Sequence, residues 1–181
     1  DCRDTGSYFL SLGKMSHFRF IEKNIDVSAI LADIKSEDWA VAGSLQGAAG
    51  DTKPYGFLPL TMAAVKHPDD DPKKTVLQQN TPMYYRYPAI RKWLKTYKLH
   101  RHSRAAFFRL RPGDTLGLHV DEGDYYLTRD RYHLSLQGTY LYTVEDESHQ
   151  IDPGTFFWFD NKRPHMSYNN GDVDRLTFVW D

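Results

Sequence analysis

The closing stretch of the chain, GTFFWFDNKRPHMSYNNGDVDRLTFVWD (residues 154–181), contains the alternation that decides the fold. Successive side chains of a β-strand point to opposite faces, and one face of the last segment collects the apolar residues Leu176, Phe178 and Trp180. The opposite face begins with Arg175. An arginine on an otherwise apolar strand needs an anionic partner, because a desolvated charge without one is costly. The stretch therefore predicts a largely buried strand and raises the question of which anion its arginine meets.

The same period of two extends backwards to Ser103. Turn signals at 111–114 (RPGD) and 152–154 (DPG) separate short alternating segments, and a long one covers 131–145 with Gly138 inside it. A glycine within a strand pattern favours a bend or a bulge. Several short strands at fairly even spacing indicate a mainly β protein, built as a sandwich or a small barrel.

The N-terminal half has a mixed pattern. Residues 18–25 alternate weakly and predict an edge strand. Residues 26–39 predict a helix with Asp26 as its N-cap, and 87–99 predict a second helix with Pro88 in its first turn. Two segments are expected to be loops, 43–56 and 65–74. The helices are expected to flank the β-structure.

Length and composition favour one folded domain. The chain has 181 residues, of which 40% are hydrophobic and 14% aromatic, enough for a sizeable core. We expect a single domain over 15–181, and we interpret 1–14 as a tag remnant or an upstream tail. No repeat or low-complexity linker divides the chain.

Charge and cysteine content restrict the partners. The formal net charge is -1, which argues against nucleic acid or a membrane surface as the main partner. The basic segment 90–104 is interpreted as a solvated helix face. The single cysteine excludes an intramolecular disulfide, and no apolar run approaches the length of a membrane span. We expect a cytoplasmic protein.

A metal site is predicted from three residues. His119 and Asp121 are two positions apart, so a strand would direct both to one side. His165 follows the apolar strand at 155–159 and is the natural third ligand. Two histidines and one carboxylate form the facial triad that suits non-haem Fe(II) and leaves positions open for other ligands.

Each member of this set also has an ordinary interpretation. An H-x-D pair occurs by chance in surface turns, and His165 alone could be a loop histidine that bonds a backbone group. His100 and His102 form another pair at the same spacing, within a basic segment that is predicted to be exposed. The ordered combination favours the metal site, because Arg175 follows the last ligand by ten residues. Its planar fork matches a carboxylate and stays charged when desolvated.

In this order of motifs the sequence resembles the Fe(II)/2-oxoglutarate-dependent oxygenases. The finer resemblance is to the aspartyl/asparaginyl β-hydroxylase-like group, which includes certain bacterial proline hydroxylases. Three segments carry it: FFRLRPGDTLGLHVD, RYHLSLQG and PGTFFWFDNKRPHMSYNNGDVDRLTFVWD. The resemblance covers roughly 104–181, whereas 15–103 match loosely. Asp121 places the chain with the members that keep the metal carboxylate and argues against a halogenase.

The resemblance implies a double-stranded β-helix (a jelly-roll, cupin-like barrel) and an oxygenase. His119, Asp121 and His165 would bind Fe(II), and Arg175 would bind the distal carboxylate of 2-oxoglutarate. Arg131 matches the group's second co-substrate arginine. The products would be succinate, CO₂ and a hydroxylated amino acid or Asp/Asn-type peptide residue, with O₂ as co-substrate.

Alternatives remain for two of the co-substrate residues. Arg131 could instead form a surface ion pair with Asp130 or Asp174. His133, which would share the inward face of the 131–137 strand, could equally make a buried structural hydrogen bond. Tyr125 and Tyr126, in the loop after the ligands, could form a lid or contact the substrate. The aromatic residues at 156–159 are interpreted mainly as packing core.

Two other functions compete with the hydroxylase. The first is a non-catalytic cupin-like barrel that binds a metal or a small anionic ligand. The second is a different metal reaction on the same barrel, such as that of a cupin isomerase or dioxygenase. Such sites usually contain more histidines and do not need Arg175, so this arginine counts against them.

Overall fold

The computed structural model describes residues 15–41, 44–45, 55–64, 67–71, 74, 77–96 and 103–181. The predicted tail at 1–14, Cys2 and the pair His100 and His102 lie outside these residues.

The C-terminal half forms two antiparallel sheets whose strands alternate along the chain. One sheet contains the run β10-β7-β12-β5 and the other has the order β6-β11-β8-β9, so the chain changes sheet at every step except from β8 to β9. This order is that of a jelly-roll, the double-stranded β-helix that was expected. Its strands are β5 (Ala105–Leu110), β6 (Thr115–His119), β7 (Arg131–Gln137), β8 (Tyr140–Val144), β9 (Glu147–Ile151), β10 (Phe156–Phe159), β11 (His165–Tyr168) and β12 (Arg175–Trp180).

Strands from the N-terminal half extend the first sheet on both sides. β1 (Phe18–Glu22) pairs with β10 at one edge, which confirms the predicted edge strand. β3 (Tyr55–Ala63) pairs with β5, and β2 (Ser44–Leu45) and β4 (Gln78–Asn80) pair with β3. The expectation of a loop over 43–56 was therefore wrong in part. Pro59 concealed β3, because proline is depleted from strands, and the β3–β5 register shifts directly after it.

The predicted helix at 26–39 is two short helices, α1 (Ser28–Asp33) and α2 (Asp38–Val41). Asp26 accepts the Ser28 backbone N–H, although Val27 occupies the N-cap position itself. The break occurs where Ile34 is extended and the Asp38 carboxylate accepts the Lys35 backbone N–H. A 3₁₀ turn, η1 (Pro82–Arg86), precedes α3 (Pro88–Thr96), which begins at the predicted proline. In the described parts of the chain, no helix has the length and apolar character to cross a membrane.

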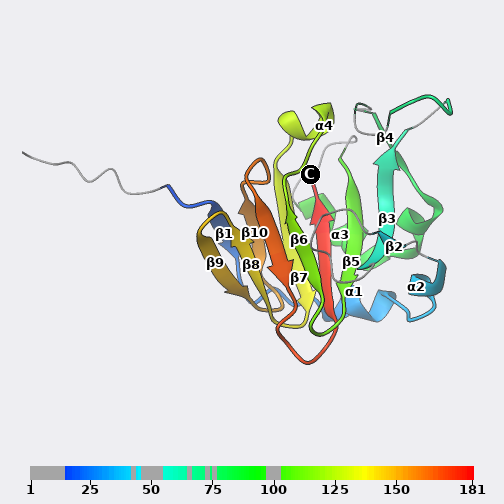
Figure 1. The fold of residues 1–181 in the computed structure, drawn as a ribbon. Helices are drawn as coiled ribbons and strands as arrows, with labels where there is room; N and C mark the ends of the chain where they lie inside the picture. Colours follow the sequence, from blue (N-terminus) through cyan, green and yellow to red (C-terminus); the bar gives the residue numbers. More distant parts are fainter. Residues whose placement is uncertain are drawn as a thin grey trace, which may run out of the picture.

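The two faces of the large sheet have different roles. One face packs against α1 and α3 in a core that contains Ile30, Ile90, Phe107, Phe178 and Trp180. Figure 1 shows these helices on the far side of the sheet from β6, β8 and β9. The other face is turned to the small sheet and packs the second core, namely Phe18, Tyr140, Tyr142, Val144, Ile151, Phe157 and Phe159. Of the aromatic residues at 156–159, Phe156 belongs to the helix-side core and Phe157 and Phe159 belong to the second core.

The alternation predicted for β12 is confirmed. Leu176, Phe178 and Trp180 belong to the helix-side core, whereas Arg175 faces the barrel interior and is 2% exposed. The bend expected at Gly138 lies between β7 and β8, with φ of +74°. A Cβ at Gly138 would lie 3.0 Å from the carbonyl oxygen of Asp174, so this glycine lets the β7–β8 turn approach the start of β12.

Candidate metal centre and its cavity

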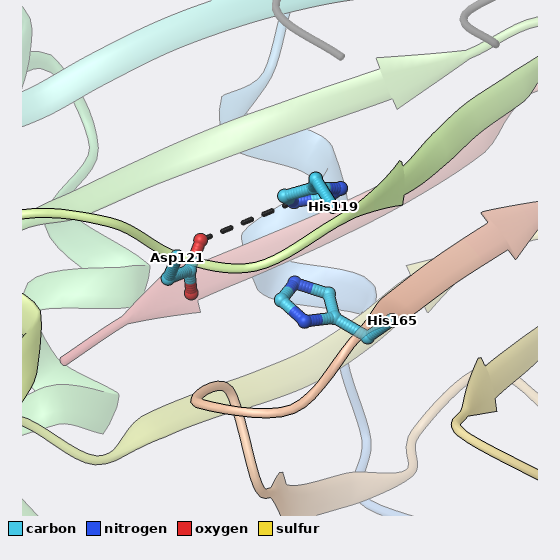
Figure 2. A group of neighbouring side chains, drawn as sticks. All are labelled: His119, Asp121 and His165. Atoms are coloured by element: carbon cyan, nitrogen blue, oxygen red, sulfur yellow. Dashed lines mark ion pairs between the residues drawn. The ribbon is translucent and has the colours of Figure 1, made fainter. Parts of the chain in front are cut away.

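His119, Asp121 and His165 come together at one end of the barrel. His119 ends β6 and His165 begins β11, and the two residues are direct partners in the antiparallel pairing. Asp121 follows His119 on the turn that leaves β6. One ligand atom of each residue lies within 4.8 Å of the others, and Figure 2 shows the three side chains converging on one point. His119 Nε2 is 3.9 Å from Asp121 Oδ1.

Backbone carbonyls orient both imidazole rings. His119 Nδ1 is 2.7 Å from the Gly117 carbonyl oxygen, and His165 Nδ1 is 2.8 Å from that of Arg163. A carbonyl only accepts hydrogen bonds, so in each ring Nδ1 carries a proton, and in the neutral ring Nε2 presents its lone pair. Burial lowers the pKa of His165 to about 4, with His119 adding to this effect and Asp121 opposing it. At neutral pH His165 is therefore uncharged, as a metal ligand must be.

Asp121 is held by an arginine that is itself held by a second aspartate. Arg131 Nη1 lies 3.0 Å from Asp121 Oδ1 and 2.9 Å from Oδ2, and Asn161 Nδ2 donates to Oδ2 at 3.2 Å. Arg131 also binds Asp181 through Nε to Oδ1 at 2.6 Å and Nη2 to Oδ2 at 3.1 Å. The alternative pairing of Arg131 with Asp130 or Asp174 is wrong.

Burial disfavours the charge of Arg131, but Asp121 and Asp181 raise its pKa well above the ordinary value. Its expected contact with 2-oxoglutarate stays a prediction. Asn161 and Asp181 received no role from the sequence. The signal for Asp181 was a charged residue at the end of a fully buried strand, where it needs a cationic partner.

Arg175 has a different environment in the same barrel. Its Nε donates to Thr177 Oγ1 at 2.8 Å, and its Nη1 donates across to Ser167 Oγ of the small sheet at 2.7 Å. Its guanidinium carbon lies 4.1 Å from the centre of the Tyr140 ring. Within the described parts of the chain, Arg175 forms no ion pair with a carboxylate. A buried guanidinium in such surroundings suits an anionic ligand.

Unpartnered polar atoms accompany this arginine. Ser135 Oγ, Tyr140 Oη and His133 Nδ1 are buried without a hydrogen-bond partner among the described residues. Native proteins rarely leave buried polar atoms unsatisfied, so these atoms are available to ordered water or to a polar ligand. Burial, with the positive charges of Arg175 and Arg131, lowers the pKa of His133 well below its ordinary value. The structural hydrogen bond considered for His133 is not formed at Nδ1, and its co-substrate role stays a prediction.

All six residues expected at the site line one cavity of about 650 Å³. This volume is in the range of sites for small organic ligands. Its wall is also formed by exposed apolar side chains, Met62, Leu118 and Val120, and by Tyr126 and Arg104. Tyr126 belongs to the short helix α4 (Asp124–Leu127), whereas Tyr125 is 1% exposed and packs inside. Of the two tyrosines that were expected to form a lid, only Tyr126 therefore lines the cavity.

The donor set fits iron. Two neutral imidazole nitrogens and one carboxylate on a single side are the ligands of non-haem Fe(II) sites, which keep further positions open. The rings are already oriented by carbonyls, and the carboxylate by Arg131 and Asn161. A second group, His17, Glu145 and Asp146, also lies within 4.8 Å, but Glu145 and Asp146 are exposed and Glu145 pairs with Arg163.

The chain belongs to the aspartyl/asparaginyl beta-hydroxylase family, whose model matches residues 51–181. The match begins well before residue 104, where the recognisable motifs begin, and so includes β3 and α3. No curated protein matches the sequence.

Two solved structures show partial similarity to the chain. A predicted oxalate decarboxylase from Thermotoga maritima has a TM-score of 0.45 at 16% identity, covering 77% of this chain and 89% of that one. A cupin 2 conserved barrel domain protein from Salinispora arenicola has a TM-score of 0.37 at 12% identity, covering 43% of this chain and 60% of that one. The strand order, rather than these overlaps, establishes the fold.

Proposed function

We propose that this protein is an Fe(II)- and 2-oxoglutarate-dependent oxygenase that hydroxylates an amino acid or an Asp/Asn-type residue of a peptide. One observation carries the proposal: the group of His119, Asp121 and His165 opens into the same cavity as a buried arginine suited to an anion. A metal site alone fits many reactions, but this pairing fits a chelating co-substrate with a distal carboxylate.

Each residue has a definite task in this reaction. His119 and His165 would hold Fe(II) through Nε2 and Asp121 would hold it through a carboxylate oxygen, a ligand set that leaves coordination positions for other molecules. Arg175 binds the distal carboxylate of 2-oxoglutarate, assisted by hydroxyl groups beside it. Iron with 2-oxoglutarate and O₂ supplies the oxidising power for an unactivated C–H bond, and succinate and CO₂ are the co-products.

The barrel supplies orientation and a dry environment. Phe157, Phe159 and Tyr142 pack around His133 behind the site and exclude water from that side. Arg131 and Asn161 keep Asp121 in one orientation, so that the carboxylate is ready for the metal. A single domain over 15–181 and a cytoplasmic location are parts of the same proposal.

The decisive experiment incubates the iron-loaded protein with 2-oxoglutarate and O₂ and measures succinate. Amino acids and short peptides are added in turn, and each productive substrate raises succinate in step with a hydroxylated product. His165→Ala serves as the control, because it removes one ligand and should abolish both succinate formation and tight iron binding.

Absence of 2-oxoglutarate binding by calorimetry, together with background succinate for every substrate, would refute the proposal. That result would favour the non-catalytic barrel, which binds a metal or an anion without turnover.

A further inference from the structure

Arg104, for which the sequence suggested only a place in a basic segment, lines the cavity directly before β5. Its backbone is held on both sides. The Arg104 N–H donates to Tyr125 Oη at 2.8 Å, and the Asp181 N–H donates to the Arg104 carbonyl at 3.1 Å. Tyr125 is buried, and Asp181 belongs to the network behind Asp121. The position of Arg104 relative to the metal centre is therefore set by the fold.

The guanidinium of Arg104 is also held in place. Its Nε donates to Gln78 Oε1 at 3.3 Å, and its Nη1 donates to Tyr126 Oη at 3.2 Å. Its central carbon lies 4.1 Å from the centre of the Tyr125 ring and 5.1 Å from that of Tyr126. These two rings stand at 85° to each other, so the guanidinium occupies a corner between them. Immobilising an arginine costs conformational entropy, and a pre-oriented fork is what carboxylate recognition requires.

Tyr126 connects Arg104 to the metal centre. The guanidinium carbon of Arg131 lies 4.7 Å from the same ring centre, and Arg131 binds Asp121. The guanidinium carbons of Arg104 and Arg131 both lie within 5.1 Å of the centre of the Tyr126 ring, so the two groups are close to each other. A molecule of amino-acid size can span such a separation. In Figure 1, α4, which carries Tyr126, lies at the same end of the barrel as the C-terminal end of β12.

The cavity contains three arginines with different surroundings. Arg131 is engaged by two carboxylates, and Arg175 lies deep beside the unpartnered hydroxyls. Arg104 lines the cavity together with the apolar side chains Met62, Leu118 and Val120, which are exposed at its wall. This combination suits a ligand with a carboxylate at one end and an aliphatic part beside it.

We infer that Arg104 binds a carboxylate of the molecule that is hydroxylated, and that the aliphatic part of that molecule extends from Arg104 toward the metal centre. This inference rests on the proposed function. The carboxylate can come from a free amino acid or from the side chain of an aspartate in a peptide, and the substrates below distinguish the two. In both cases Arg104 determines specificity and takes no part in the chemical step.

The test compares acids with their amides. The iron-loaded protein is given each free amino acid and its amide, and capped peptides that contain Asp or Asn, and 2-oxoglutarate-dependent hydroxylation is measured. A charge-assisted hydrogen bond predicts that kcat/KM favours the acid about 10- to 100-fold in the wild-type protein. Arg104→Ala should bring this ratio close to one, and Arg104→Lys should keep part of it. The preference among free amino acids or among peptides identifies the source of the carboxylate.

The ratio separates recognition from folding, because a merely structural role would lower the rates for acid and amide together. Arg111→Ala is the matched control, since Arg111 is exposed in the β5–β6 turn and should keep the wild-type ratio. Equal rates for acids and amides, or a preference that survives in Arg104→Ala, would overturn the inference. So would a protein that binds 2-oxoglutarate but hydroxylates none of the acids, and this result would leave the proposed function standing. Failure to bind 2-oxoglutarate would refute both this inference and the proposed function.

Discussion

Arg131 and Arg175 lie on the paired strands β7 and β12 and line the same cavity, but their surroundings differ in charge. Arg131 binds two carboxylates, Asp121 and Asp181, at hydrogen-bonding distances. Arg175 contacts two hydroxyls and a tyrosine ring, and no carboxylate among the described residues. A buried arginine that is already paired belongs to the protein's own charge network, whereas one without an anion is suited to a ligand.

The largest effect is expected from Arg131→Ala. The substitution leaves Asp121 and Asp181 facing each other inside the barrel without their shared cation. Breaking a buried ion pair from one side destabilises a protein by about 3–5 kcal/mol. Chemical denaturation without metal should show this loss in the free energy of unfolding, and the loss for Arg175→Ala should be clearly smaller. Equal losses for the two variants would remove the distinction between the arginines.

Arg175→Ala should affect the co-substrate instead. Loss of a charged, bidentate partner is expected to weaken 2-oxoglutarate binding on the order of 100-fold, equivalent to about 2.7 kcal/mol. Calorimetric titration of 2-oxoglutarate into the metal-loaded variant measures the change, and a parallel metal titration should give wild-type affinity. Unchanged co-substrate affinity would show that Arg175 has another role.

The Asp181→Asn substitution tests whether Arg131 orients the candidate metal ligand Asp121 or binds 2-oxoglutarate. The amide keeps the shape of the carboxylate but removes the charge that holds Arg131 in its bidentate geometry. Residues that orient a metal ligand typically contribute about 10-fold or more to metal affinity. We therefore expect metal affinity to fall roughly 10-fold, with 2-oxoglutarate affinity for the metal-saturated protein changed less. The opposite order of effects would place Arg131 with the co-substrate.

His133 lines the same cavity as the two arginines, and the charges of both affect its protonation. Burial and the charges of Arg175 and Arg131 lower its pKa well below the ordinary value near 6.5. The unfolded chain therefore takes up a proton at His133 near pH 6.5, whereas the folded protein does not. The stabilisation is complete above that pH and is lost as the pH falls below it, with a slope of up to about 1.4 kcal/mol per pH unit.

This slope is obtained by comparing urea denaturation of the wild-type protein and His133→Gln between pH 7 and 5. As the pH falls, the unfolding free energy of the wild-type protein should decrease relative to that of His133→Gln. Parallel curves for the two proteins would show that His133 titrates normally.

Local patterns in the sequence were enough to predict that His119, Asp121 and His165 form a candidate metal site and that Arg175 faces inward. The alternation of β12 follows strand geometry, which repeats every two residues. β6 ends at His119, so Asp121 lies beyond the strand although it reaches the same site. The helix at 26–39 was predicted as one element from apolar residues at helical spacing up to Ile34, where the structure breaks it into two. β3 was missed because Pro59 is a poor strand residue, and only pairing with β5 explains its conformation.

The residues around the site depend on contacts between distant parts of the chain. Arg131 meets Asp181 fifty positions later, and Arg104 meets Gln78 and Tyr126 from two other elements. The sequence suggested Asp130 or Asp174 as the partner of Arg131, because without the fold either acidic residue could form this ion pair. Several acidic residues satisfy the same charge rule, and only the path of the strands selects among them.

By itself, the sequence determined the β-rich class of the fold, the three metal ligands as candidates and an inward-facing arginine on the last strand. These depend on residue type and on a period of two, which any strand imposes. The tertiary structure alone decided that Arg131 is paired, that Arg175 has no carboxylate among the described residues, and that Arg104 lines their common cavity. The physical reason is that the partner of a buried charge is chosen by the packing of strands distant in the chain.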